Sequence, residues 1–162
     1  MPVRIRLRPY HPTFIVAHYG GGIPQESRAR AGFESIQRKI RENPLEEIEI
    51  EIVRGHDDAC ESCKFRRESE TGSIWGKRHT CTSAEDPHMV AEVERINNKV
   101  FGLLGLDYGS VVNLGTLVFR LSEKIPVLDD NMLGGLDKQE AYRKGLAELL
   151  ARREQETGRT GK

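Results

Sequence analysis

Three cysteines carry the clearest chemical signal in this chain of 162 residues. Cys60 and Cys63 form a Cys-x-x-Cys pair, and Cys81 follows after a long polar loop. A Cys-x-x-Cys turn lets two sulfur atoms reach one ion, and a third cysteine near a histidine, His79, completes a tetrahedral set. The spacing therefore predicts a metal or cluster site. The alternative is three unrelated, buried cysteines.

Three histidines are candidates for the fourth ligand. His79 comes first because it lies two residues before the third cysteine, so both can reach one ion without long-range folding. His11 comes second and His56 third, because each follows a predicted strand. We expect His18 and His88 to be ordinary surface or helix residues.

The donor set fits two kinds of metal centre. Three cysteines and a histidine satisfy Zn²⁺, which in such closed sites stabilises the fold. Three cysteines can also hold a four-iron cluster with one iron open to another ligand. Thiolates dominate both sets, so ligand softness does not choose between them. The predicted function is therefore binding of an iron–sulfur cluster or zinc, for electron transfer, structure or partner binding.

An enzyme is the alternative function. An open coordination position on the metal could act on a small anionic substrate. Five basic residues between the second and third cysteines could steer that substrate: Lys64, Arg66, Arg67, Lys77 and Arg78. The other interpretation of these residues is a solvated loop. The sequence assigns no catalytic residue.

Composition limits the compartment and the partners. The 25 basic and 25 acidic side chains cancel, so no net field favours nucleic acid or an anionic membrane. No apolar run approaches the ~20 residues of a membrane-spanning helix, and the N-terminus lacks the apolar core of a signal peptide. We therefore expect a cytoplasmic protein with thiolates rather than disulfides, and a redox or protein partner. The oligomeric state stays open.

The N-terminal part predicts a strand, a helix and a second strand. Apolar residues alternate with arginines over residues 3–7, recur at helical spacing over 24–42, and alternate with glutamates over 47–53. This order favours a right-handed crossover between parallel strands. The glycines at 20–22 suit a structural turn better than an anion site.

The charged residues of the two strands should share the outer face of the sheet. They are Arg4, Arg6 and Arg8 on the first strand, and Glu47, Glu49 and Glu51 on the second. Opposite charges on neighbouring strands attract, so we expect the arginines to pair with the glutamates across the strands rather than to form a nucleic-acid patch. At the carboxyl edge, where open α/β sheets bind ligands, His11, His56 and Cys60 should lie close together.

The rest of the chain predicts helices. One helix, starting near Pro87, ends at Gly105, a second is capped by Asn113 and ends before Pro126, and a last one covers 138–154. The tail from Thr157 is expected to be disordered. The predicted division is a metal-binding α/β domain over 1–126, a linker over 127–136, and a C-terminal helix and tail over 137–162. The predicted fold is α/β, a small parallel βαβ sheet with packed helices and a Cys-rich metal-binding loop.

Several of these motifs together resemble one known family. They are Arg8-Pro9-Tyr10-His11, the run from Glu51 to Cys63, Cys81, and Leu104-Gly105-Leu106 with Gly109. Over residues 3–126 the chain resembles the bacterial and archaeal family called domain of unknown function 1284, described as iron–sulfur-binding proteins. The resemblance implies an iron–sulfur cluster as cofactor, with Zn²⁺ as the alternative.

The chain also departs from that family's pattern. The family opens with Arg-Pro-His-His and a cysteine three residues later, where this chain has Tyr10 and Phe14. Of the family's ligand positions, four carry over: His11, Cys60, Cys63 and Cys81. The resemblance therefore implies three cysteines with a histidine, or a cluster with one open iron. It also implies that position 14 adjoins the metal.

Overall fold

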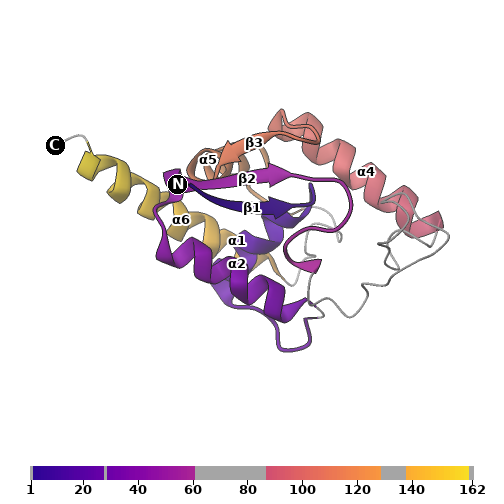
Figure 1. Cartoon of the computed structure of the whole chain (residues 1–162), viewed down its shortest axis with the longest axis horizontal. Coiled ribbons are helices and arrows are strands. Elements are labelled where there is room, and N and C mark those ends of the chain that lie inside the picture. The colour runs from indigo at the N-terminus through magenta and orange to yellow at the C-terminus, as the bar shows by residue number, and fades with distance from the viewer. Residues whose placement is uncertain (1, 28, 61–86, 129–137, 161–162) are drawn as a thin grey trace.

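The structure, a computed structural model, describes residues 2–27, 29–60, 87–128 and 138–160 and has mixed α/β architecture (Figure 1). The elements in chain order are β1 (Val3–Leu7), α1 (His11–Gly21), α2 (Arg30–Glu42), the 3₁₀ helix η1 (Leu45–Glu47), β2 (Ile48–Ile52), α4 (Pro87–Leu104), β3 (Val111–Asn113), α5 (Leu114–Lys124) and α6 (Gln139–Thr160).

The sheet has the strand order β1-β2-β3. β1 and β2 are parallel, with Leu7 opposite Ile52, which confirms the predicted strand pair. β3 adds an antiparallel neighbour to β2 that the sequence did not predict. A strand of three residues is too short to produce a recognisable alternation.

Helices cover one face of the sheet, and the other face is charged. The isoleucines of both strands at Ile5, Ile50 and Ile52 are at most 1% exposed and join one core with α1, α2, α5 and α6. On the other face, Arg4 Nη2 lies 2.7 Å from Glu49 Oε2. The predicted cross-strand pairing is therefore confirmed for Arg4. Arg8 departs from it, because its side chain is buried at the end of β1.

Helix α1 is the largest departure from the predicted elements. The helix expected over 24–42 is α2, which begins at Arg30, and α1 precedes it. α1 is buried on most sides, so its sequence has no amphipathic stripe to reveal it. It lies against α6 along its length (Figure 1).

Two glycines allow α1 and α6 to pack backbone to backbone. A β-carbon on Gly20 would lie 2.3 Å from the amide nitrogen of Gly145, and one on Gly145 would lie 1.9 Å from the carbonyl oxygen of Val16. Only glycine fits at either position. The glycine run therefore has a structural role, and Gly22, with φ +82°, ends α1.

Helix α6 also fastens the connection between α2 and β2. Arg152 donates from Nη1 to the carbonyl of Ile40 at 2.8 Å and from Nη2 to that of Asn43. Glu156 Oε2 accepts from the backbone N–H of Leu45 at 2.8 Å. The helix continues to Thr160, so the prediction of a disordered tail is wrong for residues 157–160.

The predicted ends of the middle helices are confirmed. Asn113 Oδ1 accepts from the backbone N–H of Thr116 at 2.7 Å, which caps α5. Gly105, with φ +64°, follows the last residue of α4. These local signals are reliable because cap chemistry needs only neighbouring residues.

A substitution at Gly32 tests how closely α2 must approach the chain after β2. A β-carbon there would lie 2.5 Å from the carbonyl oxygen of Ala59. Gly32→Ala should therefore lower the free energy of unfolding by about 1–3 kcal/mol in urea titrations. Gly102→Ala is the matched control, because a β-carbon at this position in α4 meets nothing within 4 Å. Equal effects of the two substitutions would contradict this packing.

Candidate functional site

The chain after β2 folds back along the free edge of β1. Gly55, with φ +85°, permits the turn. Asp58 donates its backbone N–H to the carbonyl of Arg6 at 3.0 Å and accepts the N–H of Arg6 on Oδ2 at 2.9 Å. Asp57 Oδ2 accepts the N–H of Arg8 at 2.8 Å. The two aspartates thus pair the edge groups of β1 that would otherwise be open.

Asp57 is the centre of the site. Its side chain is fully buried, and both oxygens accept hydrogen bonds. Besides Arg8 N–H, Oδ2 accepts from His11 Nδ1, while Oδ1 accepts from Ala59 N–H at 3.1 Å and from the Cys60 thiol at 3.2 Å. One carboxylate therefore joins the end of β1, the start of α1 and the turn after β2.

The electrostatics keep Asp57 ionised and His11 neutral. Burial alone would raise the pKa of Asp57, but the hydrogen bond from His11 and the charge and backbone N–H of Arg8 lower it below its ordinary value. Burial lowers the pKa of His11, and the charge of Arg8 lowers it further, against the opposing effect of Asp57. Neutral His11 then carries its proton on Nδ1, facing Asp57, and its Nε2 is the basic nitrogen.

Cys60 is a protonated thiol in this environment. Burial, together with the negative charge of Asp57, raises the pKa of Cys60 to about 12. Its sulfur also lies 3.5 Å from Arg8 Nη2 and 3.4 Å from the backbone nitrogen of Asp57. A thiol held in this way is a poor nucleophile. The same two N–H donors would stabilise the thiolate if a metal replaced the proton.

Arg8 is the residue that the sequence pattern placed wrongly. It alternates with Arg4 and Arg6 but lies beyond the end of β1, where it is 8% exposed. Its guanidinium lies over the Tyr10 ring, 5.1 Å from the centroid, and reaches Cys60. It therefore supplies positive charge beside the buried sulfur.

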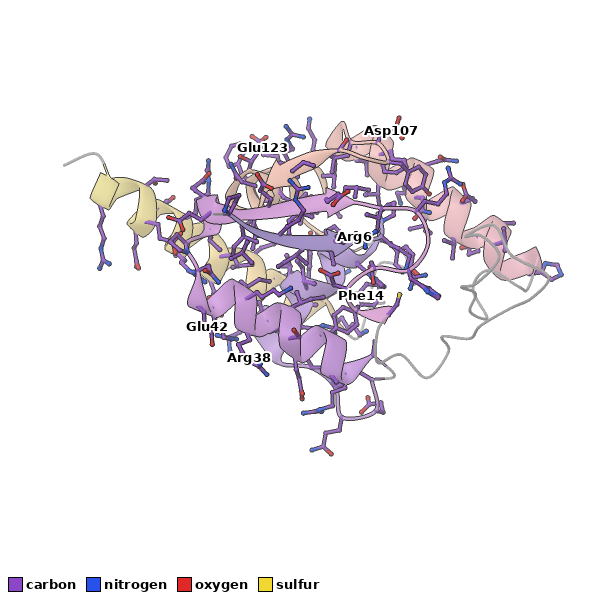
Figure 2. All side chains as sticks on the ribbon, viewed as in Figure 1. Arg6, Phe14, Arg38, Glu42, Asp107 and Glu123 are labelled. Atoms are coloured by element: carbon purple, nitrogen blue, oxygen red, sulfur yellow. The ribbon has the colours of Figure 1, made fainter. Side chains whose placement is uncertain are left out.

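Aromatic rings of α1 and α2 pack against His11. Phe14, labelled in Figure 2, lies 5.6 Å from His11 between ring centroids, and Phe33 lies 5.5 Å from it. His18, two turns further along α1, lies 4.5 Å from Phe33 between ring centroids and is 4% exposed. His18 is therefore a buried helix residue and not an ordinary surface histidine, whereas His88 is exposed on α4.

The predicted ligands are placed only in part. His11 and Cys60 come together on Asp57, as the carboxyl-edge argument predicts. Cys63, His79 and Cys81 lie outside the described residues. Within the described ranges, no group of three or more His, Cys, Asp or Glu side chains is arranged to hold a metal ion. His56 is half-buried in the turn after β2.

Comparison of the chain with family models, with curated proteins and with solved structures gives no match. The resemblance to the domain of unknown function 1284 family therefore stays a prediction. No helix in the described part of the chain is long and apolar enough to cross a membrane.

Asp57→Asn tests the central carboxylate. The amide removes the buried charge and replaces one accepting oxygen with an NH₂ group, which would face hydrogen-bond donors. The free energy of unfolding should therefore fall by about 3 kcal/mol. Asp58→Asn is the matched control, because its carboxylate accepts one exposed backbone hydrogen bond, from Arg6. It should cost about 1 kcal/mol or less. If urea unfolding gives the two variants the same stability, Asp57 is not the centre of the site.

A second prediction concerns pH. Burial, with the charge of Lys138, lowers the pKa of His18 from 6.5 to about 4. Between these pH values the unfolded chain binds a proton that the folded chain does not, so stability falls as pH falls. His18→Gln should remove up to about 3 kcal/mol of this pH-dependent loss. The measurement is urea unfolding at pH 6.5 and pH 4.

His88→Gln controls for the loss of a histidine at an exposed position. It should show the same pH-dependent loss of stability as the wild type. A wild-type slope in His18→Gln would show that His18 titrates normally in the folded protein.

Proposed function

We propose that the protein binds a zinc ion or an iron–sulfur cluster through Cys60 at the carboxyl end of the β1–β2 pair. The observation that supports this most is the environment of the Cys60 sulfur. Arg8 Nη2 and the backbone N–H of Asp57 are both within hydrogen-bond distance of it. Donors of this kind surround metal-bound thiolates and lower their charge.

The remaining sulfur ligands of the proposal are Cys63 and Cys81. Both rest on the sequence spacing, because they lie outside the described residues. A centre bound by Cys60 would release the proton that its thiol now donates to Asp57. When bound, zinc would supply structural stability, and a cluster would supply one-electron chemistry.

We keep His79 as the proposed histidine ligand because it lies two residues before Cys81 in the sequence. Asp57 occupies Nδ1 of His11, so only Nε2 is left to bind a metal. That nitrogen is on another edge of the ring from the carboxylate that Cys60 contacts. We therefore assign His11 a positioning role: it holds the Asp57 carboxylate against the backbone beside Cys60.

Metal analysis after anaerobic purification tests the proposal. A brown protein with iron and sulfide would indicate a cluster, and a colourless protein with one zinc would indicate the zinc site. Cys60→Ser, Cys63→Ser and Cys81→Ser should each lose most of the bound metal. Ser62→Ala, between the first two cysteines, is the matched control and should retain it.

The histidine assignment has its own test. His79→Ala should change the metal stoichiometry or the visible spectrum, whereas His11→Ala should keep the metal and lose stability. Full metal content in Cys60→Ser would contradict the proposed site. Loss of metal in His11→Ala but not in His79→Ala would reverse the assignment of the histidine.

A further inference from the structure

A cavity of about 460 Å³ is lined in part by His11. It is bounded by α1, by Phe33 of α2, by the turn after α1 and by the start of α6. Its volume falls within the range of small-molecule sites, which is about 300–1,000 Å³. No sequence pattern indicates this cavity, because α1 shows no amphipathic stripe and its contact with α6 is long-range.

The cavity wall contains a buried polar atom that a ligand could satisfy. His18 lines the cavity, is 4% exposed, and its Nδ1 has no hydrogen-bond partner in the described part of the chain. An unsatisfied buried nitrogen costs about 1–3 kcal/mol. Native proteins keep few such groups unless a ligand or water completes them.

The charges around the cavity favour an anion. Lys138 is half-buried at the start of α6, and its Nζ lies 4.7 Å from the centroid of the Phe14 ring. Among the described residues no carboxylate forms an ion pair with it. Glu26 also lines the cavity but is exposed, where water screens its charge. The cation is therefore the charge closer to the interior.

The apolar wall suits a flat ring. Phe14 and Phe33 lie 6.5 Å apart between ring centroids with planes inclined by 29°, and both line the cavity. Aromatic ligands pack well against such faces. A ligand that combines a planar apolar body with one negative group would use every feature of this wall.

We propose that this cavity binds a small aromatic carboxylate. Its carboxylate pairs with Lys138, its ring packs on Phe14 and Phe33, and His18 forms a hydrogen bond to it. No covalent step is involved. The proposal does not rest on the metal site, because neither Lys138 nor His18 contacts Cys60 or Asp57 in the structure.

Titration of the full-length protein, as purified, with benzoate tests the proposal. Two-dimensional ¹H–¹⁵N NMR should show saturable shifts at backbone amides on the cavity wall, at Ala17, Gly21 and Ala141. Benzyl alcohol and benzylamine share the ring but are neutral and cationic. They should bind at least about tenfold more weakly, because a charge-assisted pair is lost or reversed.

Lys138→Met removes the cation and keeps most of the side-chain length. It should weaken benzoate binding about tenfold or more and leave the metal content unchanged. Lys144→Met is the matched control, because Lys144 is exposed on α6 and faces Glu148. It should bind benzoate like the wild type. His18→Phe keeps a ring of similar size without nitrogens and should also weaken binding.

Three results would overturn the proposal. They are the absence of saturable shifts with benzoate, equal binding of benzylamine and benzoate, and equal effects of Lys138→Met and Lys144→Met. Each can occur with the metal site intact, so failure here is distinct from failure of the proposed metal function. If benzoate binds and metal analysis finds no bound metal, the cavity proposal is supported and the proposed metal function is not.

Discussion

The fully buried carboxylate of Asp57 is the interaction on which the rest of the site depends. It accepts hydrogen bonds from the end of β1, from His11 and from the turn that carries Cys60. A buried charge is stable only when its oxygens are satisfied, so these groups must be in place together. The carboxylate thus fixes the carboxyl end of the strand pair, and Gly32 lets α2 close over the backbone at Ala59.

The same construction explains why the site has two sides. On the strand side, Arg8 and the backbone N–H of Asp57 face the Cys60 sulfur, an environment suited to a thiolate on a metal. On the helix side, His11 borders a cavity whose described lining includes the rings of Phe14 and Phe33 and the cation of Lys138. His11 touches both regions, so a ligand in the cavity and a metal at the sulfur would share one positioning residue.

Much of the fold could be predicted from local patterns, and the failures share a physical cause. The β1–β2 pair and the cap at Asn113 depend on alternation and neighbouring residues, so the sequence reveals them. Helix α1 is buried by α6 from the far end of the chain and so shows no amphipathic stripe. Arg8 keeps the strand alternation but leaves the strand, which only the backbone path reveals. The proximity of His11 and Cys60 could be predicted because parallel strands end at the same edge of a sheet. The roles of Asp57 and His18 could not, because they depend on burial, which the sequence does not reveal.

The protonation state of His11 tests the account most directly. If an ionised Asp57 holds the imidazole, long-range ¹H–¹⁵N NMR at pH 7, assigned with His11→Gln, should find the proton on Nδ1 and a bare Nε2. A bare Nδ1 with the proton on Nε2 would show that the carboxylate does not organise the site in the way described.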